Sequence, residues 1–182
     1  MRLPVIRSMA AALLGLALSA CEPATDSDDD TGLLDGVEID LLEAMVIAAQ
    51  AEPDGITLDA ELSDEEGDGP QYDIDRQVDG ETLEIVIDAR TGSVVRVRTD
   101  PEDQVDGVEQ AEALQNSVGQ ITLAVAVENA MAAAPGQAVS AELDLDEAWI
   151  EVVLIEGEER RLIAIDLDDG SVRLDSVPVG GD

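Results

Sequence analysis

The feature that most constrains the fold of this chain is a turn that occurs twice with the same flanking pattern. Leu83–Val97 reads LEIVIDARTGSVVRV and Leu162–Leu174 reads LIAIDLDDGSVRL, so that Asp, Gly, Ser and Val recur at one constant offset. Two apolar runs around a residue that tolerates positive φ predict a β-hairpin. Because this hairpin recurs, we predict that the body of the chain is a tandem duplication.

The apolar periodicity predicts a helix followed by four strands in each copy. In the first copy, we expect a helix over 34–51 and strands over 56–62, 71–78, 82–88 and 93–98. In the second copy, we expect a short helix over 108–115, a helix over 121–134 and strands over 138–145, 148–156, 160–166 and 171–176.

The predicted fold class is α+β, with two tandem repeats that each pack a helix on a small antiparallel β-sheet. The repeats cover residues 34–99 and 108–176, with a linker over 100–107 between them and a tail over 177–182. Only 1 % of the residues are aromatic, so Val, Ile, Leu and Ala must form the core. Since two such small cores would each be thin, we expect the repeats to pack together.

The N-terminus has the features of an export signal. Two arginines precede an apolar run that is too short to span a bilayer and that ends in Leu18-Ser19-Ala20-Cys21. This ending resembles the lipobox of bacterial lipoproteins, which implies that residues 1–20 are a signal peptide and that Cys21 carries lipid. A plain secretory signal with an accidental cysteine is the alternative. Residues 21–33 are predicted to be an acidic disordered tether.

The charge of the chain excludes one class of partner. The formal net charge of −34 arises from 43 acidic residues against nine basic ones, and there is no histidine. An acidic surface of this kind repels phosphate backbones, so we predict no nucleic-acid partner. Two interpretations of the acidity stay open: adaptation to a saline environment, or binding of cations or of an electropositive partner.

The second copy of the turn resembles a calcium loop without fitting the pattern. An EF-hand needs Gly at position 6 and Glu at position 12, whereas counting from Asp166 places Gly170 at position 5 and Val177 at position 12. The first copy has Arg90 where the second has Asp168. We therefore interpret both segments as hairpin turns. Residues 63–69 are predicted to be a solvated loop, with weak binding of divalent cations as the alternative.

No motif in the sequence indicates catalysis. The chain has no His to activate a nucleophile and no Gly-rich phosphate loop. A glycosidase needs only two carboxylates, but few aromatic side chains are present to stack on sugars. Tyr72 and Trp149 are expected in the core or half-exposed on strands, with a binding role for Trp149 as the alternative. We predict that the protein is not an enzyme and has no catalytic residue, metal or cofactor.

Each copy has a helix ending at Pro-Gly, then several strands and a closing Asp-x-x-x-Gly-x-Val turn. The segments that carry this pattern are three in each copy: Ala44–Gly55, Tyr72–Ile74 and Ile87–Val94, then Ala130–Gly136, Ile150–Val152 and Ile165–Val172. In these features both copies resemble the PepSY domain family. The family is similar to a segment of the propeptides of secreted metallopeptidases. The resemblance implies a module that binds or restrains peptidases at the cell surface.

The predicted function is that of a non-catalytic envelope lipoprotein acting as a protein-interaction module, and the resemblance implies that it modulates a secreted or envelope peptidase. An acidic, calcium-type cation-binding envelope protein is the alternative. We expect lipid on Cys21 to anchor the chain to a bacterial membrane, on the periplasmic side of the outer membrane. A sheet edge or groove would receive an extended partner segment by strand addition.

Overall fold

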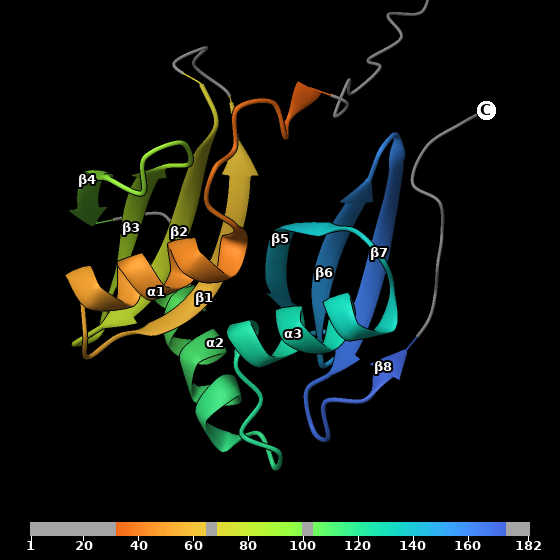
Figure 1. Ribbon diagram of the computed structural model, residues 1–182. Coiled ribbons are helices and arrows are strands. Elements are labelled where there is room, and N and C mark those ends of the chain that lie inside the picture. The colour runs from red at the N-terminus through yellow and green to blue at the C-terminus, as the bar shows by residue number, and fades with distance from the viewer. Residues whose placement is uncertain (1–31, 65–68, 100–103, 174–182) are drawn as a thin grey trace, which may run out of the picture.

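All the strands belong to one antiparallel sheet in the computed structural model, which describes residues 32–64, 69–99 and 104–173 (Figure 1). The spatial order is β4-β3-β2-β1-β5-β6-β7-β8, and all neighbouring strands are antiparallel. The strands are β1 (Ile56–Ser63), β2 (Gln71–Val78), β3 (Glu81–Asp88), β4 (Val94–Thr99), β5 (Gln137–Asp144), β6 (Trp149–Glu156), β7 (Glu159–Asp166) and β8 (Val172–Arg173).

The two halves of the sheet meet where β1 and β5 lie side by side, at what we call the β1–β5 junction. The N-terminal half (β1–β4) and the C-terminal half (β5–β8) extend outward from this junction in mirrored order. The prediction of antiparallel sheet and helices is confirmed, but the strands form one large sheet and not two small ones. Three residue pairs connect the halves: Asp59 with Glu142, Ala60 with Ala141, and Glu61 with Ser140.

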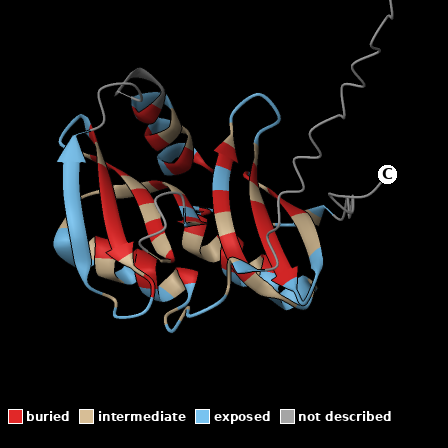
Figure 2. Cartoon of the chain, turned by 90° about the horizontal axis from the view of Figure 1, so that it is seen from above, coloured by how far each residue is buried: buried red, intermediate tan, exposed pale blue. Residues whose placement is uncertain are grey.

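Helices lie on both faces of the sheet (Figure 2). On one face, α1 (Leu41–Ala51) and α3 (Leu123–Ala133) each contact strands of both halves. On the other face lies α2 (Gln104–Asn116), in which a Cβ on Gly107 would meet Thr82 Oγ1 at 2.2 Å and Gln77 Oε1 at 2.8 Å. This close approach of α2 to the sheet requires glycine. The helix thus begins inside the segment that the sequence predicts as a linker over 100–107.

The core under α1 and α3 consists of aliphatic side chains from both halves of the sheet. Four alanines that are fully shielded from solvent bring the two helices close to the strands: Ala44, Ala48, Ala126 and Ala130. Tyr72 is also fully buried, and its hydroxyl donates a hydrogen bond to the Ile39 carbonyl oxygen at 3.0 Å. One connected cluster of buried residues joins the two halves. The halves therefore pack together, as expected from the small size that each separate core would have.

The first helix begins later than the sequence pattern predicts. Asp40 caps α1, since its Oδ1 accepts a hydrogen bond from the Glu43 amide at 2.8 Å and the Glu43 carboxylate accepts one from the Asp40 amide at 3.3 Å. Before this cap, the amides of Glu38 and Ile39 donate to the Ala89 carbonyl oxygen. Residues 38–39 therefore join the end of β3 and do not extend the helix. For α3, Thr122 is the cap, within two residues of the predicted start.

An arginine from the sheet binds the end of each of the helices α1 and α3. Arg76 of β2 is almost fully buried, and its guanidinium donates to Thr57 Oγ1 at 2.6 Å and to the Glu52 carbonyl oxygen at 3.1 Å, as well as to the Gly55 carbonyl oxygen. Arg161 of β7 donates to the Pro135 carbonyl oxygen at 2.9 Å. These bonds satisfy carbonyl groups at the C-cap of α1 and just beyond the ends of α1 and α3.

Candidate functional site

The two recurring Asp-to-Gly segments are hairpin turns in which the aspartate side chain binds the backbone. Asp88 Oδ1 accepts hydrogen bonds from the amides of Arg90 at 2.9 Å and Thr91 at 2.8 Å. These bonds hold the pKa of the Asp88 carboxyl below its ordinary value. Asp166 Oδ1 accepts from the Asp168 amide at 2.9 Å, and its other oxygen binds Arg173. The carboxylates of Asp88 and Asp166, which a calcium loop would offer, are thus engaged in the turns.

Glycine is required at both turns because of backbone conformation and limited space. Gly92 has φ of 69° and Gly170 has φ of 70°. A Cβ at Gly92 would lie 3.1 Å from Ile47 Cδ1, whereas one at Gly170 would lie 2.8 Å from Ile121 Cδ1 and 3.2 Å from Asn129 Nδ2. The turn of the C-terminal half is therefore the tighter one.

Gly170→Ala is expected to lower the free energy of unfolding by about 2 kcal/mol, of which about 1 kcal/mol reflects the left-handed backbone. Gly157→Ala is the matched control, because Gly157 has φ of 64° and nothing lies within 4 Å of its Cβ position. Urea unfolding of both variants measures the difference. Equal losses in the two variants would show that the contact with Ile121 has no effect.

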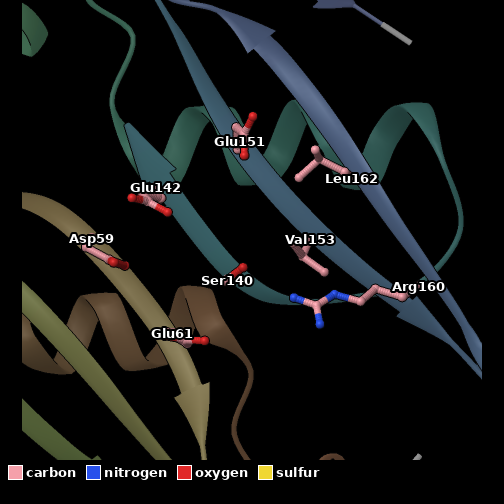
Figure 3. A pocket seen from close by; sticks show the side chains of 8 residues that line it. All are labelled: Asp59, Glu61, Ser140, Glu142, Glu151, Val153, Arg160 and Leu162. Atoms are coloured by element: carbon pink, nitrogen blue, oxygen red, sulfur yellow. The ribbon is translucent and has the colours of Figure 1, made fainter. Parts of the chain in front are cut away.

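A pocket with acidic walls lies on the sheet face opposite α1 and α3, across the β1–β5 junction (Figure 3). Its volume is about 220 Å³. Strand alternation places the side chains of Asp59, Glu142 and Glu151 on the same face of three neighbouring strands. In Figure 3 the Arg160 side chain extends from β7 across β6 toward Ser140. We call this the acidic pocket; it is lined by Asp59, Glu61, Ser140, Glu142, Glu151, Val153, Arg160 and Leu162.

The acidic pocket favours the protonated form of one carboxyl group. Burial, followed by the negative charges of Glu142, Asp75 and Glu61, raises the pKa of Asp59 to about 8. Burial and three neighbouring carboxylates also raise the pKa of Glu151 above its ordinary value. Asp59 therefore keeps its proton at neutral pH, which reduces the repulsion between Asp59 and Glu142 across the junction.

The acidic pocket has no residues that indicate a particular reaction or metal. A neutral and a charged carboxyl group are what acid–base catalysis uses, but the lining residues include no aromatic side chain to hold a sugar ring. Within residues 32–64, 69–99 and 104–173, no group of three or more Asp or Glu side chains is arranged to hold a metal ion. We therefore treat the acidic pocket as an electrostatic feature of the junction.

The outer strand β4 is a free edge of the sheet, since β3 is its only partner among the described strands. All six residues of β4 are exposed. They include three valines: Val94 is 41 % exposed, Val95 is 58 % exposed and Val97 is 43 % exposed. Arg96 Nη2 binds Glu84 Oε1 at 2.7 Å and Arg98 Nε binds Glu84 Oε2 at 2.9 Å. The free edge thus combines exposed apolar side chains with two guanidinium groups.

An apolar hollow of about 340 Å³ lies along the outer side of α1. Its lining residues are Ile39, Asp40, Leu42, Glu43, Val46 and Ile47, and Val46 is 55 % exposed. The hollow adjoins the turn that leads into β4, because Ile47 and Ile39 are the nearest neighbours of the Cβ position of Gly92. The apolar surfaces of α1 and of the free edge are therefore close together.

The residues that sequence reasoning singled out occupy different places. Cys21, the predicted lipid-attachment site, lies outside the described residues, as do 65–68 of the predicted acidic loop. Trp149 is half-buried at the start of β6, with the Arg173 guanidinium 5.8 Å from the centre of its ring. The acidic pocket was not predicted, because its carboxylates are distant in sequence and alternate like those of any solvated strand face. No described helix has the length and apolar character needed to cross a membrane.

Comparisons with known proteins connect part of the chain to a family. A search of curated proteins finds no match. Among solved structures, a protein of Clostridium difficile 630 described as a "putative lipoprotein" is 22 % identical, with a TM-score of 0.44, and the match covers 76 % of this chain and 95 % of that one. Residues 38–98, which include α1 and the N-terminal half of the sheet except its last residue, Thr99, match the PepSY family, described as "Peptidase propeptide and YPEB domain".

Proposed function

We propose that this protein is a non-catalytic interaction module of the bacterial cell envelope that binds a peptidase and modulates its activity. The observation that supports this proposal is the PepSY match over residues 38–98, since that family is described by its peptidase propeptides. A propeptide-like module acts by binding and needs no catalytic group of its own. Lipid on Cys21 would hold the module at a membrane surface, with residues 21–33 as the tether.

The shape of the matched region is consistent with a binding role. It contains both the free edge of the sheet and the apolar hollow of α1. Monomeric proteins usually cover or shorten such edges, because exposed strands pair with other chains. Exposed apolar side chains beside unpaired backbone groups therefore support the interaction of this half with a partner.

The proposal extends to the second half of the chain, residues 108–176, as a second PepSY-like copy. The mirrored strand order on the two sides of the β1–β5 junction supports a tandem arrangement, as do the matching turns at Gly92 and Gly170. The outermost strand of the second copy, β8, is described for only two residues. The N-terminal half thus offers the longer described edge.

The test is to add the full-length protein, purified in a mild non-ionic detergent, to the secreted and envelope peptidases of its host. Dose-dependent inhibition that is complete near one equivalent is the expected result. A heat-unfolded sample of the same chain at the same salt is the control, because it keeps the net charge of −34 without the fold. Unchanged activity of all the peptidases would refute the assignment of a peptidase as partner.

A further inference from the structure

We propose that the free edge of β4 accepts an extended protein segment in which apolar and acidic residues alternate, added to the sheet as a further strand. This inference rests on the proposed function, since it specifies where an interaction module would bind and what it would recognise. It is based on three features of β4: the unpaired backbone along its outer edge, the valines on one face and the arginines on the opposite face.

The backbone of β4 is suited to pairing. In an antiparallel sheet, the N–H and C=O groups of alternate residues in an edge strand point away from the sheet. In β4 this edge is six residues long, and every residue in it is exposed. A segment that adds to β4 therefore gains main-chain hydrogen bonds without displacing any described part of the protein.

One face of β4 is apolar. The register pairs Val94 with Ile87 and Val97 with Ile85, and an irregularity of register at Val95 places both valines, three residues apart, on the face of the sheet that α1 covers. The exposed Val46 lines the apolar hollow of α1, and this hollow adjoins the turn at Gly92, just before the first residue of β4. Side chains of an added strand that point to this face would meet apolar surface.

The opposite face of β4 is positively charged. The register pairs Arg96 with Val86 and Arg98 with Glu84, on the side away from α1. The two arginine side chains are 47 % and 55 % exposed, whereas that of Glu84 is 11 % exposed, so the charged groups that solvent reaches are mainly the guanidinium groups. Arg96 and Arg98 both bind the Glu84 carboxylate, and their guanidinium groups remain open to solvent in a chain with a net charge of −34. Carboxylates are the complementary groups for this face.

These two faces determine the pattern of the partner. Successive side chains of a strand point to opposite faces, so a strand beside β4 would place every second residue against the valines and the others against the arginines. Apolar–acidic alternation satisfies both faces. A second copy of β4 does not, because its own arginines would face Arg96 and Arg98, and two strongly acidic proteins repel one another.

The experiment uses a fluorescein-labelled peptide of about eight residues, alternating Val and Glu, which is long enough to cover the six residues of β4. Anisotropy is measured with the full-length protein at about 0.15 M salt, where the Debye length is about 8 Å and the charge of the remaining surface is screened. We expect saturable binding of this peptide. Methylation of alternate backbone nitrogens on its hydrogen-bonding side should abolish binding, because strand addition needs those N–H groups.

The variants separate the two faces. Arg96→Gln combined with Arg98→Gln should weaken binding of the Val–Glu peptide about tenfold, through the loss of two charged contacts. Val97→Thr, which keeps the shape of the side chain, should weaken binding several-fold, whereas Val118→Thr is the matched control at a valine that is 86 % exposed and outside β4. Circular dichroism verifies that each variant is folded.

Three outcomes of the peptide experiment would overturn the inference: no binding of the Val–Glu peptide, equal binding of the N-methylated peptide, or preference for a Val–Lys peptide. The last would indicate attraction to the acidic surface as a whole. Light scattering of the protein alone tests the self-pairing alternative. Peptidase inhibition that persists in the Arg96→Gln, Arg98→Gln variant would refute the edge as the binding surface and leave the proposed function standing, since the two tests have separate readouts.

Discussion

Replacing Asp59 by Asn is expected to raise the free energy of unfolding by several kcal/mol at pH 9 and by little at pH 4. Asp59 lies at the β1–β5 junction directly opposite Glu142, with Asp75 opposite it on β2. Burial and these neighbouring carboxylates raise its pKa from 3.8 to about 8. Asparagine keeps the size and the polarity of the neutral acid and cannot ionise.

The direction of the effect follows from proton binding. Below pH 3.8, Asp59 is protonated in both the folded and the unfolded states and contributes no difference. Between that pH and about 8, the unfolded chain releases the proton while the folded chain keeps it, so the wild type loses stability as pH rises. Above about pH 8 both states are ionised and the loss stays constant. The stabilisation by Asp59→Asn must therefore grow across this interval.

Urea unfolding of wild type and variant at several pH values between 4 and 9 measures this difference. Carboxylates distant from Asp59 titrate equally in the two proteins, so subtraction removes them and leaves Asp59 together with the groups that interact with it. Asp54→Asn is the control, because Asp54 is an exposed aspartate in the loop after α1 and its replacement also removes one negative charge. A difference between wild type and Asp59→Asn that is independent of pH would contradict a raised pKa for Asp59.

Ile74→Ala and Ile150→Ala are each expected to lower the free energy of unfolding by about 3–4 kcal/mol, and to shift one shared transition. Both isoleucines are fully buried, Ile74 in β2 and Ile150 in β6. They occupy opposite halves of the sheet but belong to the same cluster of buried residues. A defect in one half should therefore destabilise the other half.

Trp149 allows this coupling to be measured. It is the only tryptophan and lies in the C-terminal half, at the start of β6, so its fluorescence reports the unfolding of that half. Far-UV circular dichroism reports the unfolding of the whole sheet. We expect Ile74→Ala to lower the urea midpoint equally by both methods. Val118→Ala is the exposed-valine control and should change neither midpoint by much. A fluorescence midpoint that stays at the wild-type value in Ile74→Ala would show that the two halves unfold independently.

The sequence predicted the elements of this fold better than their assembly. Apolar alternation around Gly92 and Gly170 identifies both hairpins because the turn chemistry is local. In contrast, the pairing of β1 with β5 rests on three residue pairs, and two of them contain acidic residues that look like any solvated strand surface. The close contact of Gly107 with Thr82 likewise depends on tertiary structure, so the start of α2 could not be located from the linker sequence.

Candidate surfaces were even less accessible to sequence reasoning. The possibility of strand addition at a sheet edge could be stated, but the identity of the edge depends on strand order, which the sequence does not specify. Valines at Val94, Val95 and Val97 have the same pattern in an edge strand as in a central one. Only their exposure in the folded chain distinguishes the two cases. The acidic pocket also requires strand order, because it joins carboxylates from β1, β5 and β6.

The two arginines that bind carbonyl groups near the helix ends also bear on how the two halves compare in sequence. Arg76 lies opposite Leu83 in the N-terminal half, and Leu154 lies opposite Arg161 in the C-terminal half. The same cross-strand pair is thus present in reversed order, and the guanidinium reaches the end of the nearby helix from either strand. An alignment that scores each position separately counts two mismatches here. A comparison of the cross-strand pairs counts none, so positional identity understates how alike the two halves are in structure.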